Sequence, residues 1–135
     1  MKKLIYQVYL GKRSKLYDHC TASVKAYAKR IGAHYEVQRT PILMIKPDPF
    51  MTNRSKESYE KHGGFLPIYE KENAFAYLKT YDQVAIIDAD CYIRDDAPSI
   101  FDELPSDYSF GGVLESDMPI PPEYKIKIVN YTRMQ

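Results

Sequence analysis

The sequence has little of several features, and each scarcity argues against a class of protein. Only two of its 135 residues are cysteines, Cys20 and Cys91, and they lack the spacing of a zinc site or a disulfide framework. The longest apolar runs are far shorter than the roughly 20 residues that cross a bilayer, so no membrane span is expected. A net charge of +1 gives no reason to expect a nucleic-acid partner. Neither a G-x-G-x-x-G pattern nor a P-loop occurs, which argues against dinucleotide binding and ATP hydrolysis.

What is present fits one ordinary globular domain. The length lies near the common domain size, and 44% of the residues are hydrophobic and 27% charged, so we predict a single domain over residues 1–135. The amino terminus has a basic start but no secretory cleavage site, and two free thiols suit a reducing compartment. We therefore expect a cytoplasmic protein.

Apolar patterning predicts a strand, a helix and a second strand near the amino terminus. Residues 3–10 form a run of β-formers that stops at Gly11, residues 16–31 follow the helical period, and residues 34–39 alternate as in a strand. The basic loop 12–15 between the first strand and the helix has two interpretations, a nucleotide contact or a solvated connector. Together these elements form a βαβ unit of an α/β fold.

Residues 81–96 contain the most informative pattern. An unbroken apolar run at residues 84–87 predicts a central strand buried on both faces, and it ends at Asp88 and Asp90. Because side chains alternate along a strand, we expect both carboxylates on one face, roughly 7 Å apart. Such oxygen ligands suit Mg²⁺ or Mn²⁺, and ligands of open α/β sheets bind at the carboxyl ends of the strands. The competing interpretation is a pair of solvated turn residues.

The remaining chain is predicted from shorter patterns. Residues 40–66 contain three prolines and no clear regular structure, whereas residues 67–81 read as a helix. A short helix is expected at residues 99–104, and strands at 109–114 and 123–131. The broad apolar face of the helix at 67–81 would consist of Ile68, Ala74, Phe75, Tyr77 and Leu78.

The stretch YEKENAFAYLKTYDQVAIIDADCYIRDDAPSIFDEL resembles a segment of GT-A-type glycosyltransferases, in which a helix leads into a strand ending in a metal-binding Asp-x-Asp. The resemblance covers residues 69–115. It implies a Rossmann-like nucleotide-sugar-binding fold with a mostly parallel central sheet flanked by helices. It also implies that Asp88 and Asp90 hold Mn²⁺ or Mg²⁺ on the donor diphosphate. The implied activity is sugar transfer from a nucleoside-diphosphate donor, with a UDP-sugar favoured, to an unknown acceptor.

The resemblance suggests further site residues. Lys71 would face the donor phosphate or sugar, although a solvated lysine is the alternative. Tyr9 and Leu10 would line the base, with Tyr9 stacking on uracil unless it is a core tyrosine. Glu115 and Asp117 are weaker candidates to contact the donor sugar or to act as the catalytic base.

The chain also departs from the family. No histidine follows His62 to act as a late metal ligand. The resemblance also implies a further, acceptor-binding part, which we expect to be missing from these 135 residues. We therefore expect a donor-binding portion, a small enzyme completed by another subunit such as a second copy, or a non-catalytic donor-binding module. A sugar-phosphate nucleotidyltransferase is disfavoured because residues 11–15 lack the glycine-rich G-x-G-x-R loop of that class.

Overall fold

The computed structural model describes residues 1–46, 60, 65–103, 108, 111, 119 and 121–126. The chain divides into two compact units, residues 1–102 and residues 103–135. In the described part of the second unit, residues 122–126 form a helical turn where the sequence predicted a strand. The strand expected at residues 109–114 falls almost entirely outside the described residues.

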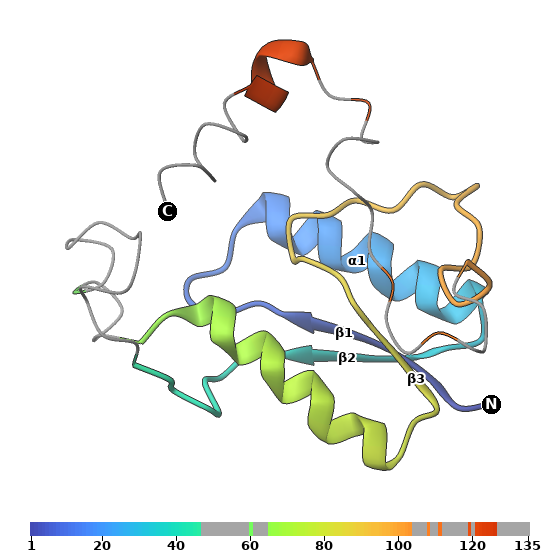
Figure 1. The fold of residues 1–135 in the computed structure, drawn as a ribbon, viewed down its shortest axis with the longest axis horizontal. Coiled ribbons are helices and arrows are strands. Elements are labelled where there is room, and N and C mark those ends of the chain that lie inside the picture. The colour runs from blue at the N-terminus through green and yellow to red at the C-terminus, as the bar shows by residue number, and fades with distance from the viewer. Residues whose placement is uncertain are drawn as a thin grey trace. The chain divides into compact units, whose positions relative to one another are not determined.

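The first unit contains a parallel sheet built from three strands. Its elements are, in order, β1 (Lys3–Val8), α1 (Lys15–Arg30), β2 (His34–Gln38), η2 (Pro67–Lys79) and β3 (Gln83–Ile86). The sheet order is β2-β1-β3, and β1 runs parallel to both neighbours (Figure 1). The predicted α/β class, with a parallel sheet flanked by helices, is confirmed.

The central strand is β1, whose residues 4–7 are all buried. The prediction that residues 84–87 form a central strand buried on both faces is wrong for the described chain. There β3 is an edge strand, its residues are only partly buried, and Ile86 is 42% exposed. The apolar run at residues 84–87 indicates that these side chains pack against the helices. It does not indicate whether the strand is paired with other strands on both sides.

Alternate side chains of β1 pack against different helices. Ile5 lies in a buried cluster with Val24 and other residues of α1, whereas Leu4 and Tyr6 lie in a second cluster with Ala74 of η2. Figure 1 accordingly shows α1 on one side of the sheet and η2, the yellow-green helix, on the other. Each face of the sheet is thus covered by one helix.

The helix α1 ends where the sequence predicts, at a glycine. Gly32 has a φ of 69°, a left-handed conformation that glycine adopts without steric cost. Its N–H donates to the carbonyl of Lys29 over 3.3 Å, and the N–H of Ala33 donates to Ala28 over 2.9 Å. These two bonds form a Schellman motif, which satisfies carbonyls that the helix end leaves open.

The helix η2 is a 3-10 helix that begins at Pro67. Its inward positions are Glu70 and Ala74, which are buried, whereas Ile68, Phe75 and Leu78 are 48%, 66% and 52% exposed. The predicted apolar face is therefore wrong for these three residues. The buried Glu70 and Ala74 and the half-buried Tyr77 follow one another at spacings of four and three residues, so the helix meets the sheet along a narrow face, and the predicted face was too broad.

After β3 the chain passes along α1. The Tyr27 hydroxyl donates to the carbonyl of Pro98 over 2.7 Å and accepts the N–H of Ile100 over 2.7 Å. The Ser23 hydroxyl accepts the N–H of Ile93 over 3.0 Å. Residues 92–93 therefore do not extend β3, and residues 99–102 form a turn in place of the predicted short helix. Within the described residues, no helix has the length and apolar character to cross a membrane.

Candidate functional site

The carboxyl ends of the three parallel strands define one edge of the sheet. The chain leaves β1 toward α1 and β2, whereas β3 lies on the other side of β1 and is reached through η2 on the opposite face. The order of the sheet therefore reverses between β1 and β3. Such a switch point is where open α/β sheets leave a crevice for a ligand. Tyr9, Leu10 and Asp88 follow the ends of β1 and β3 at this point.

The two acids of the Asp-x-Asp triplet lie in a turn after β3. The N–H of Cys91 donates to the carbonyl of Asp88 over 3.1 Å, which closes a turn over residues 88–91. Both aspartates are exposed, and Ala89 between them is buried. The expectation that both acids stand on an extended strand is therefore wrong, because residues 88–91 form a turn.

Buried polar groups hold this turn in place. Gln7, which has no exposed surface, donates through its amide nitrogen to the carbonyl of Asp88 over 3.0 Å. The amide oxygen of Gln7 accepts the Tyr35 hydroxyl over 2.8 Å. The Cys20 thiol lies 3.4 Å from the carbonyl oxygen of Asp90. Sequence reasoning missed Gln7, although a polar residue inside an apolar strand was the available signal.

The structure brings Lys71 and Asp88 together as an ion pair between η2 and the turn. Their side chains are 32% and 52% exposed. A partly solvated pair of this kind contributes only about 0–1 kcal/mol to stability. Its more important consequence is positional, since it sets an ammonium group beside the first aspartate at the switch point.

The carboxylates of the turn over residues 88–91 suit a metal site that is completed by water and substrate oxygens, but not a site made of protein side chains alone. Among the described residues, no three His, Cys, Asp or Glu side chains are grouped so that they could hold a metal ion. Asp88 and Asp90 therefore do not form an all-protein cage. Two exposed carboxylates do fit Mg²⁺ or Mn²⁺ when water and diphosphate oxygens complete the shell, as is usual for Mg²⁺. Burial and then the charges of Asp88 and Asp90 raise the pKa of the Cys91 thiol, which disfavours the thiolate form that binds metal ions.

Tyr9 is packed on several sides. It is 3% exposed, the guanidinium carbon of Arg39 lies 3.6 Å from its ring centroid, and Tyr17 meets its ring at 5.3 Å. Its hydroxyl accepts the N–H of Ser14 over 2.6 Å. A base that stacks directly on Tyr9 would have to displace Arg39. Leu10 is half-buried.

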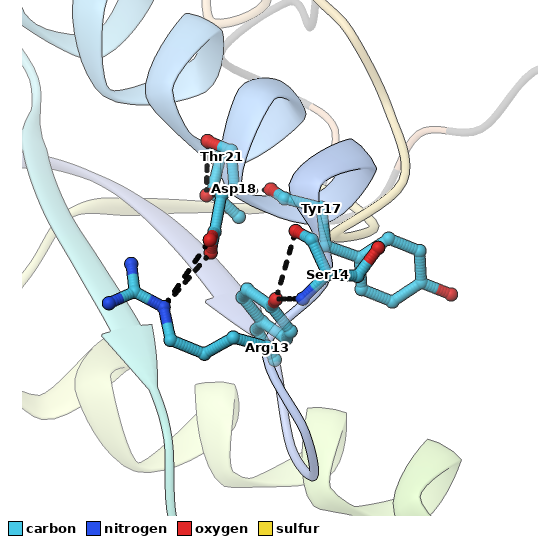
Figure 2. Close-up of polar contacts among 6 residues, drawn as sticks. Arg13, Ser14, Tyr17, Asp18 and Thr21 are labelled. Atoms are coloured by element: carbon cyan, nitrogen blue, oxygen red, sulfur yellow. Dashed lines mark hydrogen bonds and ion pairs between the residues drawn. The ribbon is translucent and has the colours of Figure 1, made fainter.

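The basic loop after β1 is tied to the start of α1. Figure 2 shows Arg13 directed at Asp18, and the Nε–Oδ2 distance is 3.3 Å. The Thr21 hydroxyl donates back to the carbonyls of Tyr17 and Asp18 over 2.8 and 3.2 Å. Lys12 is exposed at the carboxyl end of β1. The loop is thus anchored through Arg13, while Lys12 faces solvent.

A second polar cluster, which the sequence did not predict, surrounds the carboxylate of Glu70. This side chain is 1% exposed and accepts hydrogen bonds from Gln38 and from the backbone N–H groups of Ile42, Leu43 and Met44, over 2.6–3.1 Å. Burial acts to raise the pKa of Glu70, but these hydrogen bonds outweigh it, so the pKa lies below its ordinary value. An acid inside a helix gave no sequence signal, because its partners are backbone groups of a distant loop.

Glu115 and Asp117 lie outside the described residues. The structure thus brings the predicted site residues together only in part. Lys71 of η2 pairs with Asp88, Asp90 lies in the same turn as Asp88, and Tyr9 and Leu10 follow the end of the neighbouring strand β1. No protein-family model, curated protein or solved structure matches this chain.

Proposed function

We propose that this chain binds a nucleoside-diphosphate sugar and serves as the donor-binding part of a metal-dependent glycosyltransferase. The observation that carries the proposal is the placement of Lys71, Asp88 and Asp90. An ammonium group and two exposed carboxylates lie at the switch point of a parallel α/β sheet. This combination suits a diphosphate held through a divalent ion on one side and a direct cation on the other.

Each residue has a distinct role in this proposal. Asp88 and Asp90 hold Mn²⁺ or Mg²⁺, which neutralises the charge that grows on the departing nucleoside diphosphate. Lys71 binds a diphosphate oxygen once the donor competes with Asp88 for its ammonium group. Gln7 and Cys20 contact the backbone of the turn and keep the two carboxylates in position.

In the transfer itself, an acceptor hydroxyl forms a bond to the anomeric carbon of the sugar as the bond from that carbon to the diphosphate breaks. The hydroxyl proton passes to a base. Glu115 and Asp117 stay the sequence-based candidates for that base, and a UDP-sugar stays the favoured donor.

Two observations favour a second candidate, a donor-binding module without turnover. Asp88 is already neutralised by Lys71, and the described residues supply no third metal-ligating side chain. Such a module would bind the nucleotide but release no free sugar and transfer none. Detection of donor hydrolysis or transfer that is lost in Asp90→Ala, with the fold intact, would eliminate this candidate.

Calorimetric titration of UDP and then GDP, with and without Mn²⁺, tests the proposal. We expect binding that depends on the metal and is lost in the double variant Asp88→Asn/Asp90→Asn. The matched control is Asp95→Asn/Asp96→Asn, because these two exposed acids lie in the following turn. Metal-independent binding, or equal losses in both double variants, would contradict the assigned site.

A further inference from the structure

Residues 42–45 form an exposed apolar loop directly after the carboxyl end of β2. The exposed fractions of Ile42, Leu43, Met44 and Ile45 are 57%, 38%, 52% and 36%. Single exposed apolar residues are ordinary on a protein surface, but four in succession are not. Contiguous apolar surface of this kind marks a contact with a partner or a membrane.

The backbone of this apolar loop is held from inside. The buried carboxylate of Glu70 accepts three successive N–H groups, from Ile42 to Met44, and the carbonyl of Ile45 accepts the N–H of Leu66 over 3.4 Å. Met44 has a φ of 49°, a left-handed conformation that is uncommon outside glycine and that persists only when its surroundings hold it. The loop therefore directs its polar backbone inward while its side chains stay exposed.

The first charge on each side of the apolar loop is positive. Arg39 lies three residues before the loop and Lys46 follows it directly, whereas the nearest acid in the sequence, Asp48, comes after Lys46. Glu70 beneath the loop is 1% exposed and is occupied by its hydrogen bonds. In Figure 1 the loop is the teal segment that passes from β2 beside the first turns of η2. It therefore follows a strand end at the same sheet edge as Asp88 and Asp90.

We propose that residues 42–45 insert into the surface of a bilayer that contains anionic phospholipid. Three of the loop's N–H groups already have a carboxylate partner, so they can leave water without the penalty of an unpaired donor. The two flanking cations match anionic head groups, each at about 1 kcal/mol near such a surface. A protein partner would more typically meet an apolar patch through a rim of open hydrogen-bonding groups, whereas three of the four amide donors of this loop are satisfied internally.

The absence of tryptophan from the sequence permits a direct test. Ile42→Trp places a sole tryptophan in the loop, and Phe75→Trp places one on the outer face of η2, where Phe75 is 66% exposed. Each variant is mixed with phosphatidylcholine vesicles, with and without phosphatidylglycerol. We expect the emission of Ile42→Trp to shift to shorter wavelength and to be quenched by brominated lipid only when phosphatidylglycerol is present. No shift, or equal shifts in both variants, would overturn the proposal.

A second measurement uses the protein without a reporter. Co-sedimentation with anionic vesicles should weaken about tenfold or more in Leu43→Ser/Met44→Ser, because two inserted apolar side chains are removed. Phe75→Ser is the control and should bind as the wild type does. Unchanged circular dichroism shows that the fold survives in each variant. Absence of vesicle binding would overturn the proposal. A higher mass in sedimentation velocity would then show that the loop joins two copies of the chain, and an unchanged mass would show that the loop is covered within one chain. Both vesicle measurements are independent of the proposed glycosyltransferase activity, because neither uses a sugar donor.

Discussion

Replacement of Glu70 by glutamine tests how the loop after β2 is held. The wild-type carboxylate uses Oε2 to accept from Gln38, Ile42 and Leu43 over 2.6, 2.8 and 3.1 Å. It uses Oε1 to accept from Met44 over 2.6 Å. Glutamine keeps the shape but has one oxygen, so its NH₂ group must face at least one donor that it cannot accept from.

The loss of stability follows from these contacts. One buried N–H left without a partner costs about 1–3 kcal/mol. The other three bonds change from charged to neutral, which weakens each by about 1 kcal/mol. The lower desolvation cost of a neutral amide offsets about 1–3 kcal/mol of this sum. These terms combine to about 1–5 kcal/mol, so we expect Glu70→Gln to lower the free energy of unfolding by about 3 kcal/mol.

Urea unfolding followed by circular dichroism measures this loss. The midpoint should fall by about 1–2 M, since the slope for a chain of this size is about 1–3 kcal/mol per M. Glu72→Gln is the matched control, because Glu72 is exposed on the same helix, and its change should stay within about 0.5 kcal/mol. Equal midpoints for Glu70→Gln and the wild type would refute the role assigned to Glu70.

The same variant should alter the pH dependence. The pKa of Glu70 is lowered on folding, so the folded state binds this proton less readily than the unfolded state does. The contribution of Glu70 is therefore complete above the ordinary value of 4.5 and is lost as the pH falls through the lower, folded pKa. The stability difference between wild type and Glu70→Gln should shrink below that pH. A difference that stays constant in acid would show that the charge of Glu70 is not what holds the loop.

Two more predictions concern single side chains. Lys71→Met should change the free energy of unfolding by less than about 1 kcal/mol, because the pair with Asp88 is partly solvated, yet it should weaken UDP binding in calorimetry. An unchanged affinity would remove Lys71 from the donor site. Tyr6→Phe should cost about 1–2 kcal/mol in urea unfolding, because the buried hydroxyl of Tyr6 donates to Gln38 and accepts from Asn73 over 3.2 Å. A neutral effect would mean that Gln38 and Asn73 find other partners.

The local elements were predictable because their signals are local. The β-formers of residues 3–10, the helical period of residues 16–31 and Gly32 predict β1, α1 and the end of α1 to within about two residues, the usual uncertainty of such boundaries. The parallel arrangement also follows, since a strand, a helix and a strand joined by short loops form a βαβ unit. Asp88 and Asp90 were identified by charge directly after an apolar run.

The predictions that were wrong concern which side chains of η2 face the sheet, which strand lies at the centre of the sheet and where the strand β3 ends. Phe75 and Leu78 were assigned to the core because they are apolar and follow a helical period, but η2 meets the sheet through Glu70 and Ala74 and leaves them exposed. The run at residues 84–87 was assigned to the sheet centre, but strand order depends on long-range pairing that apolarity does not encode. Asp88 and Asp90 were placed on an extended strand, but the chain turns between them.

By itself, therefore, the sequence determined β1, α1 and β2, the α/β class and the acids that follow β3, because hydrophobic period and chain-breaking residues act over a few positions. Only the tertiary structure decided that Gln7 secures the acid turn, that Lys71 reaches Asp88 and that Glu70 holds the apolar loop. Each of these contacts joins residues at least 17 positions apart, and two of them involve a backbone group, which no side-chain pattern in the sequence reveals. Such pairings arise from how the helices cover the sheet.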